Sequence, residues 1–318
     1  YLLPGILTMV DIKRKLAIAN NRINLKLHDI LLPDYAHIRH IPQQLDIISL
    51  GSRPAKFAID FSTAGANGFN LAVIPQTLEY DFRMLKNYHS YLSDNGAGLV
   101  ILVLCPFSLL KRRYTEADGP VCADDRYYMV LHHALVNNYS ETKYQKIKRH
   151  PLLYALSIAP QLKGLLSRRL QRQLAAGGNT QTADSIGQSA RNYVQRWQAE
   201  FGIENLNSPL DNKLCDDIVF NVNIIANIKQ FCAERGLRTV IIIPPMADSL
   251  AALLPDSFLR QALYSPIANS GVDCIDFSRH NEMSHVQNYF DALCLNADGR
   301  KKFTKLMLDN LKQKGLLQ

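Results

Sequence analysis

Short, largely apolar runs alternate with amphipathic segments along most of this chain. Gly, Pro or polar residues close the runs, which cover Leu45–Leu50, Phe69–Ile74, Leu99–Cys105, Thr239–Ile243 and Val272–Ile275. Runs of this length are typical of strands that are buried on both faces of a parallel sheet. The pattern therefore predicts a parallel sheet of about five strands, with Leu99–Cys105 in its interior.

Between these runs, apolar residues recur at helical spacing. We expect helices at Thr77–Leu92, Asp216–Arg235, Ser257–Tyr264 and Ala297–Lys314. Strands that alternate with helices form a sheet covered on both faces, which is the α/β class. In such folds the binding crevice lies at the carboxyl ends of the strands, so we expect the functional residues directly after them.

The middle of the chain, Lys111–Asn207, contains no clear strand. We expect an amphipathic helix at Pro151–Leu174 and a loop at Ala175–Gly187. We interpret this section as a helical insertion packed over the carboxyl edge of the sheet, either as a lid or as a plain helical layer. The expected domains are an N-terminal extension at residues 1–44 and one α/β domain at 45–318, with the insertion at about 111–207.

The chain carries 36 basic and 28 acidic residues, a net charge of +8, and much of the excess lies in Lys143–Arg172. This basic helix is either a solvated face or a surface that docks on an anionic membrane or polymer. No nucleic-acid partner is expected, because the segment lacks interleaved aromatic residues and the chain has no zinc or helix-turn-helix signature.

The first residues, Tyr1–Val10, carry no charge and precede Lys13, Arg14 and Lys15. This order is that of a trimmed signal or anchor helix, and the alternative is a first buried element of the fold. The longest internal apolar stretch, Leu99–Phe107, is too short for a membrane-spanning helix.

The six cysteines form no CxxC motif, so the sequence predicts neither a metal site nor a cofactor. Cys105 and Cys274 end apolar runs and are expected to be buried thiols. Six cysteines in so long a chain do not imply a disulfide framework, which leaves the compartment open.

Two segments carry candidate chemistry. Gly51–Asp60 follows the first predicted strand, and Phe290–Thr304 contains Asp291, Cys294 and Gly299. Each segment is weak evidence alone, because Gly-Ser turns and acidic residues at helix starts are common.

Together the two segments resemble the motif blocks of the SGNH (GDSL-type) hydrolases. The first is similar to block I in the form Gly-Ser-Ser-His-Ala-Lys-Tyr-Gly-Ile-Asp, and the second to the last block, Phe-Asp-x-x-His-Leu-Asn-x-x-Gly-x-x-x-Phe-Thr. Phe69–Asp81 and Asp276–Ser278 resemble the family's Asn-Leu-Ala-x-x-x-Gln-Ser-Leu-x-Tyr-Asp and Asp-Tyr-Ser. The match covers Ile47–Leu110 and Thr239–Leu311 and is most similar to the envelope-polysaccharide branch, which includes relatives of the teichoic-acid D-alanylation protein.

The resemblance implies a flavodoxin-like three-layer αβα sandwich with strand order 2-1-3-4-5. It also implies triad chemistry, in which a Ser after the first strand attacks an acyl carbon and the His of an Asp-x-x-His pair takes its proton. In the family register Arg53 stands at the Ser position, Cys294 at the His position and Asp291 at the Asp position. Arginine stays protonated and a neutral thiol is a poor base, so a non-catalytic descendant is expected. Since a buried guanidinium needs a carboxylate, Asp291 is the first candidate partner of Arg53.

Other residues could replace the missing catalytic pair. Ser52 becomes the nucleophile if the turn shifts by one residue. Cys294 is another candidate nucleophile, with His280 or His285 as the base. The alternative roles are a buried thiol for Cys294 and exposed loop positions for the histidines.

Asn70 and Gln76 are candidate substrate-binding residues, because their amides can donate hydrogen bonds to an oxyanion or a sugar. Their alternative role is to tie the loop of the second strand to the first. The ligand that the resemblance implies is a glycan or an acylated polysaccharide.

Three functional hypotheses follow. The first is a protein of an envelope or exopolysaccharide pathway that is degenerate at the catalytic pair and binds a glycan or acyl-carrier partner. The second is an active O-acyl esterase or acyltransferase that uses Ser52. The third is a membrane-surface interaction protein that docks on anionic lipid or polymer through Lys143–Arg172. Envelope proteins are a further expected class of partner. The expected location is the extracytoplasmic face of the cell envelope, with a membrane anchor in the full-length chain.

Overall fold

The computed structural model describes residues 37–93, 98–114, 124–150 and 181–317. Residue contacts divide the chain into two compact units. One contains Ile41–Ala117 and Leu170–Gln318, and the other contains Tyr1–His40 and Asp118–Arg169. Part of the expected insertion, from residue 181 onward, therefore belongs to the same unit as the sheet.

The first unit is built on a five-stranded parallel sheet with the order β2-β1-β3-β4-β5. This confirms the parallel α/β architecture, the strand order and the interior place of β3. The predicted second strand is shorter than expected, because regular pairing stops at Asn70. The strands are β1 (Ile47–Leu50), β2 (Gly68–Asn70), β3 (Leu99–Val103), β4 (Arg238–Ile243) and β5 (Cys274–Asp276).

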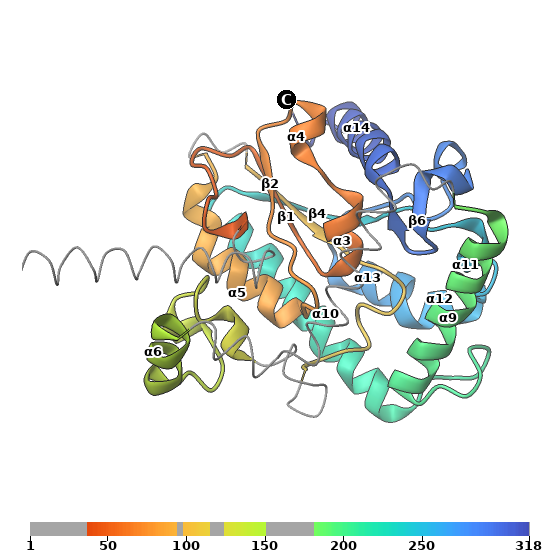
Figure 1. Ribbon diagram of the computed structural model, residues 1–318, viewed down its shortest axis with the longest axis horizontal. Coiled ribbons are helices and arrows are strands. Elements are labelled where there is room, and N and C mark those ends of the chain that lie inside the picture. Colours follow the sequence, from red (N-terminus) through yellow and green to blue (C-terminus); the bar gives the residue numbers. More distant parts are fainter. Residues whose placement is uncertain (1–36, 94–97, 115–123, 151–180, 318) are drawn as a thin grey trace, which may run out of the picture. The chain divides into compact units, whose positions relative to one another are not determined.

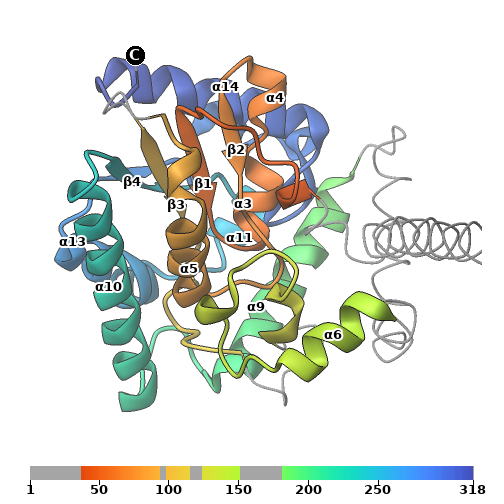
Figure 2. The same ribbon diagram turned by 90° about the vertical axis from the view of Figure 1, so that its left-hand side faces the viewer.

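Helices cover both faces of the sheet (Figures 1 and 2). One face carries α3 (Arg53–Ala58), α4 (Phe61–Ala64) and α14 (Ala297–Gln313). The opposite face carries α5 (Leu78–Tyr88), α10 (Asn212–Ala233) and α13 (Ser265–Ser270). The helices exclude solvent from both faces of the sheet, and β1 and β3 are therefore buried along their whole length.

The helices predicted at Thr77–Leu92, Asp216–Arg235 and Ala297–Lys314 are present with small shifts at their ends. In α14, Phe303, Met307 and Leu311 are fully buried, as their spacing predicted. The segment predicted as one helix at Ser257–Tyr264 is instead α12 (Asp256–Leu259) followed by a π-helical turn (Arg260–Tyr264) that leads into α13. A short helix, α11 (Asp248–Ala251), precedes it.

The loop prediction at Ala175–Gly187 is wrong in its last residues. Residues from Ala183 were expected in a loop, but α9 (Ala183–Phe201) begins there. The Thr182 hydroxyl caps the helix by accepting from the Ser185 amide, and Ile186 and Ala190 are buried at helical spacing. The capping residue and this spacing outweigh the Gly and Ser content that suggested a loop.

A hairpin that the sequence did not predict lies next to α9. Its strands, β6 (Tyr289–Asp291) and β7 (Cys294–Leu295), pair antiparallel. Figure 1 shows α9, in green, beside β6, and the two elements are in contact. The hairpin places the last motif block in a fixed geometry rather than in a free loop.

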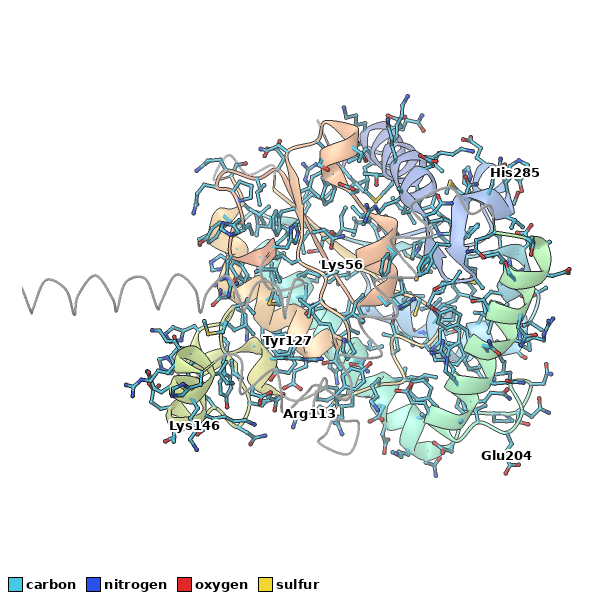
Figure 3. The ribbon with its side chains drawn as sticks, in the orientation of Figure 1. Lys56, Arg113, Tyr127, Lys146, Glu204 and His285 are labelled. Atoms are coloured by element: carbon cyan, nitrogen blue, oxygen red, sulfur yellow. The ribbon has the colours of Figure 1, made fainter. Side chains whose placement is uncertain are left out.

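The other unit is described at residues 37–40 and 124–150. It contains α6 (Glu141–Arg149), which Ser140 caps, and two 3-10 turns, Asp124–Tyr127 and His133–Leu135. Lys143 is paired with Asp125 at 2.7 Å, whereas Lys146 projects outward from α6 (Figure 3). The predicted helix at Pro151–Leu174 lies outside the described residues.

Two further findings concern the described residues. None of their helices is both long enough and apolar enough to cross a membrane. Cys105 is buried as predicted, but Cys274 is exposed, which corrects the prediction for that thiol. Cys274 lies on β5, the last strand of the sheet, and that position leaves its side chain open to solvent.

Gly299, in the first turn of α14, lies in close contact with the backbone of Asn288. A Cβ at this position would lie 2.0 Å from the carbonyl oxygen of Asn288, so the helix packs against backbone. We expect Gly299→Ala to lower the free energy of unfolding by about 2 kcal/mol or more, as measured by urea denaturation.

Gly187→Ala is the matched control, because it also adds a methyl group to a helical glycine. Its nearest neighbour would be an Arg191 side-chain nitrogen at 3.8 Å. This change should raise stability by about 0.5–1 kcal/mol through helix propensity. Equal stability of Gly299→Ala and the wild type would contradict the close packing of α14.

Candidate functional site

A cavity of about 220 Å³ lies at the carboxyl ends of β1, β2 and β3. The loops that follow these strands supply much of its lining, as the parallel-sheet interpretation predicted. The side of α9 that carries Tyr193, Trp197 and Phe201 supplies another part of the wall.

The turn after β1 positions the central residue, Arg53. It begins at Gly51, which has φ of +140°, and a Cβ there would lie 2.9 Å from the carbonyl oxygen of Val103. Only glycine allows the chain to pass so close to β3 and then turn into α3. Arg53 is the first residue of α3, and it lines the cavity.

Arg53 forms the predicted ion pair with Asp291. Its Nη2 donates to Asp291 Oδ2 at 2.8 Å, and its Nε donates to the Tyr193 hydroxyl at 2.9 Å. The guanidinium also lies 5.3 Å and 5.9 Å from the ring centroids of Phe57 and Phe290. Three parts of the chain thus hold this cation in one orientation.

These neighbours keep Arg53 charged. Burial by itself lowers the pKa of Arg53, but the charge and the hydrogen bond of Asp291 oppose this effect, and the pKa lies above its ordinary value. The Tyr193 phenol has a raised pKa, chiefly because of burial and also because of the neighbouring Asp291 carboxylate. Tyr193 therefore stays a donor, and it donates to Asp291 Oδ2 at 3.0 Å.

Asp291 is saturated with donors. Oδ2 accepts from Arg53 and Tyr193, and Oδ1 accepts from the backbone amides of Leu293 at 3.0 Å and Cys294 at 2.8 Å. The β6–β7 hairpin supplies both amides. A carboxylate that accepts from four donors is fully engaged within the protein.

Cys294 lies beside this pair as a buried thiol. It is 1 % exposed on β7. Burial raises the pKa of the thiol well above its ordinary value, and Asp291 raises it further against the opposing effect of Arg53. The neutral thiol is neither a strong nucleophile nor a base, which agrees with the buried-thiol alternative.

Ser52 points to a different set of partners. Its Oγ accepts from the backbone amide of Gln76 at 3.0 Å, and the residue lines the cavity. The Gln76 side chain donates to the carboxyl of Asp81, which also accepts from the Gly51 amide. Ser52 is therefore oriented by the loop after β2, whereas Arg53 is the residue that reaches Asp291.

Asn70 acts within the scaffold. Its amide nitrogen donates to the carbonyl oxygens of Ala55 at 2.9 Å and Ile59 at 3.0 Å, and its Oδ1 accepts from Ala72. These bonds tie the end of β2 to α3, which is the alternative role considered for it. A substrate-binding role for Asn70 and Gln76 stays a prediction.

The two candidate histidines lie in the segment that precedes the hairpin. His285 is exposed and lies on the outer side of this region, well apart from Lys56 on α3 (Figure 3). His280 is half-buried, and its ring contacts Phe277. Neither histidine lines the cavity or bonds to Cys294.

Sequence reasoning missed the contribution of α9. Tyr193, Trp197 and Phe201 recur at intervals of four residues, which is a helical signal. That spacing predicts a shared face but not its target. The structure shows that Tyr193 on this face bonds to Arg53 and that Trp197 stacks on Phe107, with their ring centroids 4.1 Å apart.

Asp81 makes the site sensitive to pH. Burial raises its pKa to about 7 from 3.8, against the opposing effect of its hydrogen bonds. A carboxyl with a raised pKa binds more protons in the folded than in the unfolded state between these values. Its stabilising contribution is therefore present at low pH and is lost as pH rises through about 7.

We expect the stability of the wild type, relative to Asp81→Asn, to fall by a few kcal/mol between about pH 4 and pH 8, at about 1.4 kcal/mol for each unit of pKa. Urea denaturation at several pH values measures this difference. Asp216→Asn, at an exposed position of α10, is the control and should follow the wild type at every pH. A constant difference for Asp81→Asn would contradict the raised pKa.

Among the described residues, no three His, Cys, Asp or Glu side chains gather closely enough to hold a metal ion. Comparisons of the chain with protein-family models, curated proteins and solved structures find no match. The chemistry of the site therefore follows from its own groups. They are a fixed cation, a saturated carboxylate, a neutral thiol and a serine hydroxyl, and together they suit binding better than proton transfer.

Proposed function

We propose that this chain is an SGNH-hydrolase-like protein of an envelope or exopolysaccharide pathway that binds a glycan or acyl-carrying partner without cleaving an ester. The observation that carries this proposal is the contact between Arg53 and Asp291. In the family register, Arg53 occupies the position of the nucleophile, and Asp291, at the position of the orienting carboxylate, is its counter-ion.

The strand order supports a flavodoxin-like sandwich as the finer description of the fold. The order β2-β1-β3-β4-β5, with helices on both faces, is the arrangement that the resemblance implies. The positions of Gly51, Gly299 and Thr304 support it further. Gly51 lets the chain turn against β3, Gly299 lets α14 approach Asn288, and the Thr304 hydroxyl accepts from the Asp60 amide at 2.9 Å.

Acyl transfer by a triad needs a nucleophile whose proton moves to a base. Arg53 has no nucleophilic lone pair at neutral pH, and the Cys294 thiol is held neutral by burial. The crevice retains shape and polarity but lacks the pair that would transfer the proton. A protein with this arrangement can hold a ligand and present it to a separate enzyme of the pathway.

The second candidate is an active esterase or acyltransferase that uses Ser52. It is favoured by one observation, namely that Ser52 lines the cavity. Its hydroxyl accepts from a backbone amide, and among the described residues no histidine lies along the cavity wall to take its proton.

A membrane-surface role for Lys143–Arg172 and a place in the cell envelope stay predictions. Only the first part of that segment, within α6, belongs to the described residues. There Lys143 is engaged with Asp125, and Lys148 lies 5.5 Å from the Tyr144 ring centroid.

The purified protein should show no turnover of nitrophenyl acetate or acetylated sugars above background. The double variant Arg53→Ser with Cys294→His should gain hydrolysis of about tenfold or more over the wild type, because it restores a nucleophile and a base beside Asp291. Each single variant should stay near background, since a serine without a base is a weak nucleophile. Steady-state hydrolysis assays measure all four proteins.

Ser52→Ala separates this proposal from the esterase alternative. Wild-type turnover that Ser52→Ala abolishes, together with labelling of the wild type by a fluorophosphonate probe, would overturn the non-catalytic account. Absence of both signals in the wild type and the variant is the result that we expect.

A further inference from the structure

The guanidinium of Arg53 has one nitrogen that bonds to no oxygen atom of the described residues. Nη2 donates to Asp291 and Nε to Tyr193, and the guanidinium also contacts the Cys294 thiol, whereas Nη1 has no oxygen acceptor among the described residues. The side chain is 23 % exposed and lines the cavity. Because Nε and Nη2 are held by the protein, Nη1 points in one fixed direction. A ligand that binds Nη1 therefore loses little side-chain conformational entropy.

The neighbouring Ser52 offers a second donor. Its Oγ accepts from the Gln76 amide, and its own proton has no acceptor among the described residues. Ser52 and Arg53 follow each other in the chain, and both line the same cavity. Two adjacent donors without acceptors favour a ligand group that is rich in oxygen acceptors.

The acidic groups of the cavity wall are already engaged. Glu200 is paired with Lys111 at 3.4 Å, and Asp81 accepts from the Gln76 side chain and the Gly51 amide. Asp291 accepts four hydrogen bonds from its own surroundings. Among the described residues, no carboxylate near the cavity therefore competes with a ligand for the two donors, Arg53 Nη1 and the Ser52 hydroxyl.

The size and walls of the cavity limit the ligand. A volume of about 220 Å³ is small for a drug-sized molecule and accommodates a group of about one sugar ring. The half-buried Trp197 supplies apolar surface beside the two donors, and the buried rings of Tyr193 and Phe107 pack against it. Aromatic side chains pack well against the apolar face of a ring while polar groups fix its orientation.

We propose that the cavity binds an anionic oxygen group, a carboxylate or a phosphate, carried on a sugar-sized ligand, with Arg53 Nη1 and the Ser52 hydroxyl as the donors. This inference rests on the proposed binding function and names the chemistry of its ligand. A charged acceptor makes stronger hydrogen bonds to a guanidinium than a neutral one does. An acidic sugar should therefore bind more tightly than the neutral sugar of the same size.

Trp197 allows a direct test, because it is the single tryptophan of the chain and lines the cavity. Its fluorescence is followed while the full chain is titrated with glucuronate, glucose 1-phosphate and glucose. We expect saturable quenching or enhancement by at least one of the acids, with an affinity about tenfold or more above that for glucose. The stronger of the two acids identifies the source of the anionic group.

Three variants locate the binding. Arg53→Gln should weaken the acid by about tenfold or more, and Ser52→Ala by about threefold to tenfold. Ser52→Ala leaves the ion pair untouched, so it remains informative if Arg53→Gln does not fold. Arg300→Gln is the control, because it removes an arginine that is paired with Asp60 at 3.0 Å outside the cavity wall and should bind like the wild type.

Three results would overturn the inference. They are no saturable response to either acid, equal affinity for glucose and the acids, and unchanged acid affinity in a folded Arg53→Gln or in Ser52→Ala. The hydrolysis assay on the same preparation tests the non-catalytic function separately. Ester turnover overturns that function, whereas loss of acid preference without turnover overturns only the ligand assignment.

Discussion

The ion pair between Arg53 and Asp291 joins the turn after the first strand to a hairpin 238 residues later in the sequence. Taking two charges out of water costs several kcal/mol unless each is paired and hydrogen-bonded, and here both are. Arg53 is also bonded to Tyr193, and Asp291 accepts two backbone amides of the hairpin. Because removing either ion would leave the other uncompensated, the β1 turn, α9 and the hairpin depend on one another.

Under the proposed function, this arrangement explains how a crevice that resembles a hydrolase site would serve for binding. A nucleophile needs a neighbour that accepts its proton, whereas a fixed cation needs only a fixed anion. With Arg53 at the start of α3, Asp291 is its counter-ion, and the Cys294 thiol is buried beside them. The donors that stay accessible then decide what the crevice holds.

Much of the fold could be predicted from sequence, because buried parallel strands are apolar throughout and their order follows from the resemblance. The ion pair was also predictable, since a motif register and the cost of a bare guanidinium both point to Asp291. Tyr193 was not, because helical spacing defines a face of α9 without naming the partner 140 residues away that it meets. The start of α9 was missed because Thr182 and its neighbours resemble a loop in composition while acting as a cap.

A double-mutant cycle on Arg53→Met and Asp291→Asn tests the central interaction most directly. Urea denaturation of the wild type, both single variants and the double variant gives four free energies of unfolding. We expect each single change to cost about 2–3 kcal/mol and the double change to cost less than their sum by about 1–3 kcal/mol. Costs that add to within about 0.5 kcal/mol would contradict the account, because they would mean that the two residues stabilise the protein independently.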